Sequence, residues 1–103
     1  ERAMADTYGG KTPQETLRMY IEAVEAGNYE LASKYFVMGK QEGELNTLLR
    51  SPKENIENVI QLLRADLESV GSYSAKKDTF VVSRPLTVTM ILYPNGIWKI
   101  TEI

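Results

Sequence analysis

The sequence predicts an α+β domain in which about four N-terminal helices pack on a C-terminal antiparallel β-meander of three to four strands. Apolar residues recur with the period of a helix up to residue 70 and alternate with the period of a strand from residue 73 onward. A hydroxyl residue precedes a proline at Thr12-Pro13 and Ser51-Pro52, which is a helix start signal. Residues 93–96, Tyr-Pro-Asn-Gly, separate the last two apolar runs and predict a hairpin turn.

The first eleven residues show no sustained periodicity and end in Gly9-Gly10, which predicts a flexible N-terminal arm. Met4 and Tyr8 could still dock on the surface. The remainder, residues 12–103, is expected to be one domain. A chain of 103 residues with 43% hydrophobic and 25% charged residues is typical of a single globular domain with its own core.

Residues 13–37 predict a helical hairpin. Thr12 is the expected N-cap, Pro13 takes the first helical position, and Glu15 stands three residues after the cap. Gly27 supplies the left-handed stop, and Asn28 caps the second helix. The apolar faces of the two helices contain Leu17, Tyr20, Ile21, Val24, Leu31, Ala32, Tyr35 and Phe36.

Residues 41–50 predict a third helix, whose apolar positions are Leu45, Leu48 and Leu49. The fourth helix is expected from Pro52 to Val70, with Ser51 as its cap and Gly71 as its end. It has the most regular pattern in the chain. Its apolar stripe contains Ile56, Val59, Ile60, Leu63, Leu67 and Val70.

Residues 73–83 predict a first strand region with a break near residues 77–78. Arg84-Pro85 is expected to be a connection, because proline lacks a donor for the ladder. The next strand alternates, so its core face contains Leu86, Val88, Met90 and Leu92. Residues 97–103 return as the last strand, and Gly96 is expected to adopt the positive φ of the turn.

Composition excludes several function classes. The chain has no cysteine and no histidine, which argues against a zinc site and excludes nucleophilic systems that need either residue. The net charge of −2, with acids and bases interspersed, argues against a nucleic-acid partner. Lys76-Lys77 is interpreted as a solvated strand or turn. No apolar run has the length of a membrane span, so this domain is not expected to insert into a membrane. No catalytic, cofactor or metal residues can be assigned.

A few side chains remain as candidates. Asp66 lies at the edge of the fourth apolar stripe, where a raised pKa would suit a base, but a flank residue that reaches solvent or pairs with a strand lysine is the preferred interpretation. Asp78 is expected in or beside a turn. The aromatic residues Tyr20, Tyr35 and Trp98 are interpreted as core rather than as ligand contacts.

The face of the penultimate strand that carries Ile91 and Tyr93 has two open interpretations. An exposed apolar patch there would suit a protein partner or a homodimer that packs sheet to sheet. The same residues also fit a lightly apolar face that is simply solvated.

Two stretches of the chain resemble nuclear-transport-factor-2-like domains of the cystatin-like superfamily. Residues 13–32 match a Pro-capped helix that ends in a Gly-Asn turn, and residues 93–100 contain a Gly-x-Trp-Lys-Ile pattern like that of the family's final hairpin. Small bacterial envelope and lipoprotein domains of unknown function share this form. Family members usually place a strand after the second helix, whereas residues 40–70 predict helix throughout, so a reduced sheet is expected. The matched motifs are structural, and no catalytic residue of the family's enzymes carries over.

The hypothesis favoured by these observations is a non-catalytic binding or protein-interaction module. The polar arm and the envelope-like resemblance favour part of a larger or anchored protein of the bacterial cell envelope, with a protein partner or self-association through the sheet. The alternative is a small-molecule-binding or enzymatic cone-type domain, with its pocket between the first helix and the sheet. An assembly subunit that pairs through an open sheet edge is a third possibility.

Overall fold

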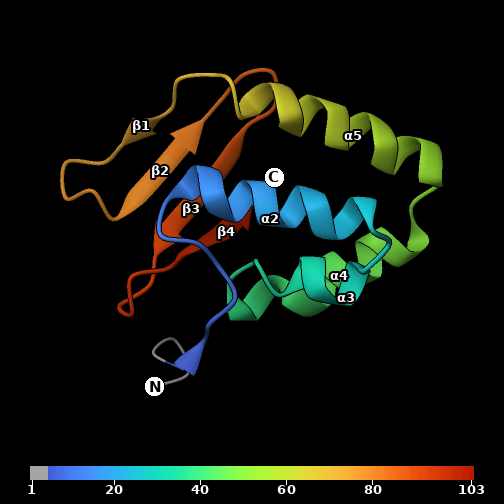
Figure 1. Ribbon diagram of the computed structural model, residues 1–103, viewed down its shortest axis with the longest axis horizontal. Helices are drawn as coiled ribbons and strands as arrows, with labels where there is room; N and C mark the ends of the chain where they lie inside the picture. The colour runs from blue at the N-terminus through green and yellow to red at the C-terminus, as the bar shows by residue number, and fades with distance from the viewer. Residues whose placement is uncertain (1–4) are drawn as a thin grey trace.

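The computed structural model of the chain describes residues 5–103 (Figure 1). Helices come first and strands last, and the four strands form an antiparallel sheet in the order β1-β2-β3-β4. The predicted α+β class and meander are therefore confirmed. The elements are α2 (Pro13–Glu25), α3 (Tyr29–Ser33), the 3₁₀ turn η1 (Met38–Lys40), α4 (Gln41–Arg50), α5 (Lys53–Asp66), β1 (Ser72–Tyr73), β2 (Thr79–Val82), β3 (Val88–Leu92) and β4 (Trp98–Glu102).

The two N-terminal caps form as predicted. Thr12 Oγ1 accepts a hydrogen bond from the backbone of Glu15 at 3.1 Å, and Asn28 Oδ1 accepts one from the backbone of Leu31 at 3.2 Å. The second helix is shorter than the predicted range, because α3 ends at Ser33. Residues 35–37 instead run along the free edge of β4, where the Ile100 amide donates to the Tyr35 carbonyl at 2.9 Å.

The start and end of α5 differ from the prediction. Ser51 does not cap this helix; its hydroxyl donates to the Thr47 carbonyl of the preceding helix at 2.6 Å. At the other end α5 stops at Asp66, and Val70 is 96% exposed rather than part of the apolar stripe. Gly71 lies beside Phe80, where an added Cβ would stand 2.2 Å from Cζ of the ring. Glycine is required here by this close approach.

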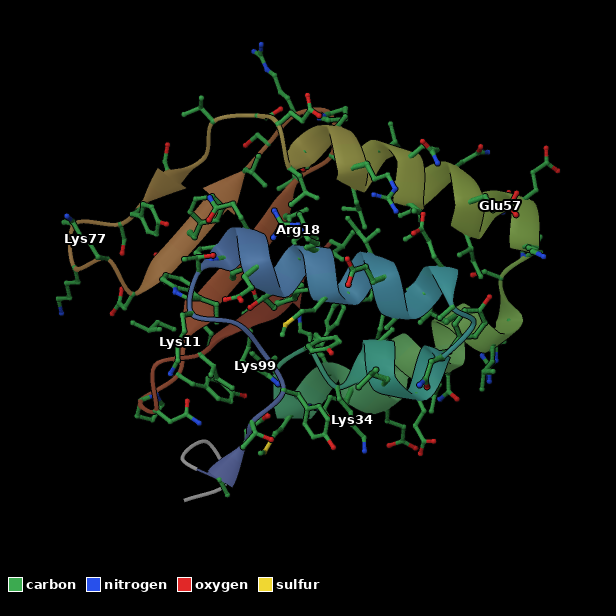
Figure 2. All side chains as sticks on the ribbon, in the orientation of Figure 1. Lys11, Arg18, Lys34, Glu57, Lys77 and Lys99 are labelled. Atoms are coloured by element: carbon green, nitrogen blue, oxygen red, sulfur yellow. The ribbon has the colours of Figure 1, made fainter. Side chains whose placement is uncertain are left out.

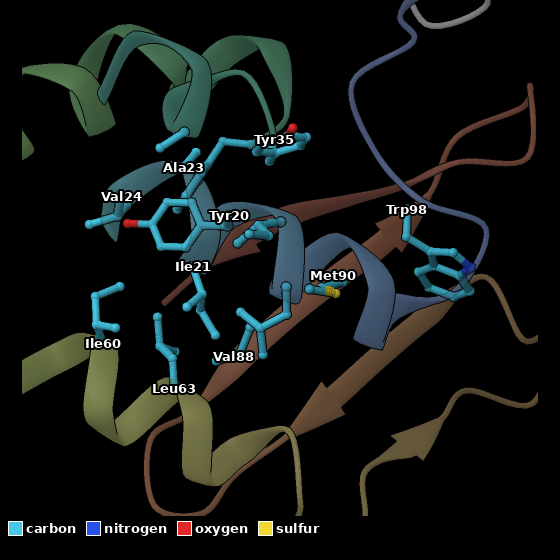
Figure 3. Close-up of a cluster of buried hydrophobic side chains, with 14 of the residues drawn as sticks. Tyr20, Ile21, Ala23, Val24, Tyr35, Ile60, Leu63, Val88, Met90 and Trp98 are labelled. Carbon is cyan, nitrogen blue, oxygen red and sulfur yellow. The ribbon is translucent and has the colours of Figure 1, made fainter. Parts of the chain in front are cut away.

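The core lies between one face of the sheet and the helices α2 and α5 (Figures 1 and 3). Val88 and Met90 of β3 are buried as predicted, whereas Leu92 is 36% exposed at the far end of that strand. Alternation places Trp98 and Ile100 of β4 on the same inner face. The helices contribute Leu17, Tyr20, Ile21, Val24, Ile56, Ile60 and Leu63.

The hairpin between β3 and β4 turns as predicted at residues 93–96. The Gly96 amide donates to the Tyr93 carbonyl at 2.9 Å, and the Tyr93 amide donates to the Ile97 carbonyl at 2.8 Å. Gly96 has a φ of 91°, a value that side chains with a Cβ rarely adopt. The predicted break in the first strand region is also present, as a turn between β1 and β2.

Candidate binding site

A cavity of about 210 Å³ lies among α2, α4 and α5. The alternative hypothesis placed a pocket between the first helix and the sheet, whereas this cavity is built mainly by helices. Ile103, the residue directly after β4, also lines the cavity. The apolar lining is Val24, Leu48, Ile56, Val59, Ile60 and Ile103, and the polar lining is Tyr20, Glu44, Thr47, Ser51 and Asn55.

Helical spacing brings these side chains to one place. Tyr20 and Val24 are four residues apart on α2 and therefore share a face. The same spacing joins Glu44 to Leu48 on α4 and Ile56 to Ile60 on α5. Figure 3 shows Tyr20, Val24 and Ile60 together at the end of the core that lies opposite Trp98. The cavity thus lies next to the core, at the end where helices rather than strands surround it.

Tyr20 and Glu44 form the polar feature of the cavity. The Tyr20 hydroxyl donates to Glu44 Oε2 at 2.5 Å, and the tyrosine ring, 3% exposed, packs edge-on against Phe36. Burial raises the pKa of Tyr20, and the Glu44 charge raises it further. Burial also raises the pKa of Glu44, while the hydrogen bond from Tyr20 opposes that rise. The prediction that Tyr20 is core holds for its ring, but its hydroxyl faces the cavity.

The Glu44 carboxylate has no positively charged partner among residues 5–103. The ion pairs found in this part of the chain join Arg64 to Glu25 and Lys99 to Asp6. Glu44 receives one side-chain hydrogen bond, from Tyr20, although a carboxylate can accept about four. The cavity therefore combines apolar walls with one carboxylate that retains most of its acceptor capacity.

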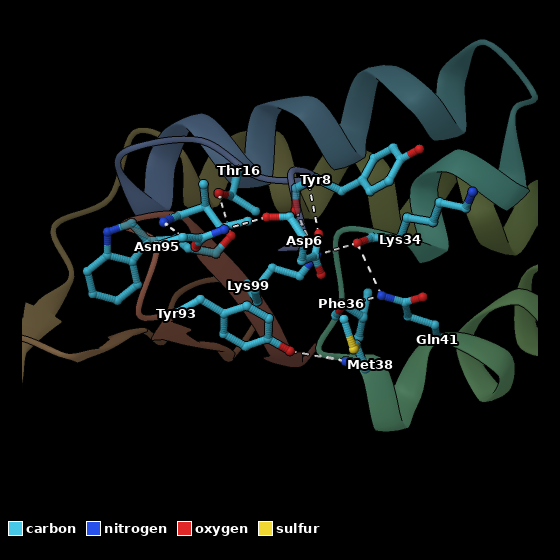
Figure 4. Close-up of polar contacts among 12 residues, drawn as sticks. Asp6, Tyr8, Thr16, Lys34, Phe36, Met38, Gln41, Tyr93, Asn95 and Lys99 are labelled. Atoms are coloured by element: carbon cyan, nitrogen blue, oxygen red, sulfur yellow. Dashed lines mark hydrogen bonds and ion pairs between the residues drawn. The ribbon is translucent and has the colours of Figure 1, made fainter. Parts of the chain in front are cut away.

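A second buried polar cluster lies around Lys99, between β4 and the N-terminal segment (Figures 2 and 4). Lys99 is completely buried, and its Nζ lies 2.8 Å from Asp6 Oδ2. It also donates to the carbonyls of Tyr8, at 2.7 Å, and Lys34, at 2.5 Å. Burial lowers the pKa of Lys99, and the hydrogen bond and charge of Asp6 oppose this effect. All three ammonium hydrogens are thus used within the protein, so this cluster is structural.

Residues 6–10, which belong to the segment expected to be a flexible arm, contact the rest of the domain in the structure. Asp6 and Gly10 are buried, and the Trp98 amide donates to the Gly10 carbonyl at 2.9 Å. Thr16 joins these segments, because its hydroxyl accepts from the Gly10 amide at 2.8 Å and donates to the Trp98 carbonyl at 2.9 Å. Tyr8 docks edge-on against Tyr35. The expectation for Met4 falls outside the described residues.

The acidic candidates of the sequence occupy structural positions. Asp66 is 2% exposed, and its Oδ1 accepts from the Leu86 amide at 3.0 Å, so it neither reaches solvent nor pairs with a lysine. Its Oδ2 is buried without a partner, and burial raises its pKa. Asp78 lies in the predicted turn, where it accepts from the Ser74 hydroxyl at 3.0 Å.

Two of the aromatic candidates lie in the core, and a third is half-buried. Tyr35 and Trp98 are buried, as predicted. Tyr93 was expected on the outer face of its strand, either in an exposed apolar patch or on a solvated face, and the structure shows neither. Its hydroxyl accepts from the Met38 amide at 3.2 Å, and its ring lies 5.7 Å from Lys99 Nζ. The outer face of the sheet therefore retains Ile91 and the 38%-exposed Val81, but not Tyr93, as its open apolar residues.

Two kinds of feature are absent from residues 5–103. No helix in this range is long and apolar enough to cross a membrane. No group of three or more acidic, histidine or cysteine side chains there could hold a metal ion.

Comparison with known proteins adds no further identification. No family model, curated protein or solved structure matches the chain. The resemblance to nuclear-transport-factor-2-like domains stays a prediction from two sequence stretches.

Proposed function

We propose that this domain is a non-catalytic binding module, and that the cavity among α2, α4 and α5 holds a small apolar ligand or an apolar side chain of a partner. The observation that carries the proposal is the cavity of about 210 Å³, with six apolar side chains in its lining. Ligand sites are typically apolar clefts with a few placed polar groups. At about 30 Å³ per water-sized group, there is room for about seven such groups.

The test uses three six-carbon probes, which are 1-hexanol, hexylammonium and hexanoate. We expect at least one to shift the NMR signals of the Leu48, Ile60 and Ile103 methyl groups in a saturable manner. Val59→Phe should abolish this binding, because Val59 lines the cavity and a phenyl ring would enter it. Leu62→Phe is the matched control, since Leu62 lies on the same helix with similar exposure (40% against 37%) but outside the cavity lining.

Two results would contradict the proposal. The first is the absence of saturable shifts with all three probes. The second is binding that survives Val59→Phe unchanged, since the probe would then occupy another site.

The enzymatic alternative would use Glu44 as a base, and its raised pKa favours that role. The Tyr20 hydroxyl acts against it, because it donates a hydrogen bond to the ionised carboxylate. A binding role requires no proton transfer and is therefore the simpler proposal. The resemblance to envelope domains further supports a place in the bacterial cell envelope, which fractionation of the source cells tests.

Self-association through the sheet is a second candidate function. Its support is the outer face of the sheet, where Val81 is 38% exposed and Ile91 is half-buried. Ile91→Lys should then reduce a dimer population seen by analytical ultracentrifugation. A wild-type protein that sediments as a monomer at high concentration would contradict this candidate.

A further inference from the structure

The acidic side chain in the cavity points to a ligand class. Five polar side chains line the cavity, and Glu44 is the charged one among them. The Ser51 hydroxyl is already used within the helix layer, where it donates to the Thr47 carbonyl. The Tyr20 hydroxyl donates to Glu44 itself. Thr47 and Asn55 also line the cavity, but their side chains are neutral. The charged group with unused capacity is therefore the Glu44 carboxylate, which accepts and cannot donate when ionised.

We propose that the cavity selects a primary ammonium group carried on a short apolar body, with the ammonium at Glu44 and the apolar body among Leu48, Ile56 and Ile60. The inference rests on the proposed binding function and names the chemistry of its ligand. An ammonium has three donors, which suit a carboxylate that receives one hydrogen bond from the protein. It also supplies the positive charge that residues 5–103 do not place beside Glu44.

Neutral and anionic ligands of the same length lack the positive charge that would pair with Glu44. An alcohol fills the apolar volume and its hydroxyl can donate to Glu44, but it carries no positive charge to pair with the carboxylate. A carboxylate of the same length would place a second negative charge against Glu44. Tyr20 cannot offset that repulsion, because its hydroxyl hydrogen is already donated to Glu44. The expected order of affinity is therefore hexylammonium, then 1-hexanol, then hexanoate.

The experiment compares dissociation constants from NMR titrations of the full chain at constant ionic strength. We expect hexylammonium to bind about tenfold more tightly than 1-hexanol, because only the ammonium adds an ion pair with the carboxylate. Glu44→Gln should remove this advantage while 1-hexanol still binds in a saturable manner, which also shows that the cavity persists in the variant. Leu62→Phe should leave both constants at their wild-type values.

The outcomes separate this inference from the proposed function. Equal binding of hexylammonium and 1-hexanol, or preferred binding of hexanoate, overturns the ammonium inference and leaves the cavity as a binding site. Retention of the hexylammonium preference in Glu44→Gln also overturns it, because another group would then select the charge. No saturable binding by any probe overturns both.

Discussion

The buried ion pair between Asp6 and Lys99 predicts a large loss in the free energy of unfolding when Asp6 is replaced. Asp6→Asn keeps the side-chain shape and an oxygen that can accept from the Tyr8 amide, as Oδ1 does at 2.8 Å. It removes the negative charge beside an ammonium that is completely buried. Breaking a buried pair from one side costs about 3–5 kcal/mol. The two carbonyls that remain around Lys99 place the expected loss near the lower end, at about 3 kcal/mol.

That loss is large enough to measure without ambiguity. For a domain of this size, 1 kcal/mol corresponds to about 4–8 °C in melting temperature, so Asp6→Asn should lower it by about 12–24 °C. Glu25→Gln is the internal control, because its partner Arg64 is 45% exposed and an exposed pair contributes at most about 1 kcal/mol. Urea denaturation of both variants gives the free energies of unfolding directly.

A double-mutant cycle identifies the source of the loss. In a Lys99→Met background, Asp6→Asn should cost much less, because no buried ammonium remains to be left unpaired. Equal costs of Asp6→Asn and Glu25→Gln would refute the reasoning. So would a cycle without coupling. Either result would mean that residues 6–10 do not hold their docked arrangement in solution.

Three further variants test other parts of the fold. Asp66→Asn should leave stability within about 1 kcal/mol at neutral pH, since its oxygen can still accept from the Leu86 amide. It should flatten the pH dependence, because a carboxyl whose pKa is raised by folding stabilises most below its ordinary pKa and loses this as pH rises through the raised value; urea denaturation at about pH 4 and pH 7 measures the slope. Gly43→Ala should raise stability by up to about 1 kcal/mol, because the added Cβ in α4 meets no atom within 4 Å, and a lower melting temperature would contradict this. Gly96→Val should destabilise by more than about 1 kcal/mol, because φ is 91° there, and an unchanged melting temperature would mean that the turn is wrongly described.

Local features of the fold were predictable because their hydrogen bonds close within a few residues. Thr12 and Asn28 each cap a helix through a backbone amide three residues ahead. Ser51 shows the limit of such rules, because a serine before a helix can also bond back to the carbonyl four residues earlier. The pattern alone does not decide between these two bonds.

The end of α5 was not predictable for a different reason. The apolar stripe continues to Val70, but Asp66 and Ser69 bond to the connection that leads into β3. These tertiary contacts join residues 15 to 20 positions apart. They occur where the helix ends, although the apolar periodicity would continue it to Val70. Helical periodicity records which face is apolar, and it carries no information on where a distant segment will dock.

The candidate site lay beyond sequence reasoning for the same physical reason. Periodicity identified Tyr20 as a core position, and it identified the leucines of α4 rather than Glu44. The hydrogen bond that joins Tyr20 to Glu44 spans 24 residues. The signal available in the sequence was the polar hydroxyl of a tyrosine on an apolar stripe, which requires a partner when buried. It does not say which residue that partner is.

Three charged side chains differ in how much of their hydrogen-bonding capacity the protein uses: Lys99 and Asp66, which are buried, and Glu44, which is half-buried. Lys99 is saturated by one carboxylate and two carbonyls, so it has no donor left for a ligand. Asp66 retains an unpaired oxygen, but the space beside it is only about 10 Å³, near the minimum for a single water molecule. Glu44 combines unused acceptor capacity with a cavity of about 210 Å³. A ligand can therefore meet a charged group at Glu44, and the six-carbon probes test the one site of the three where space and unused hydrogen-bonding capacity coincide.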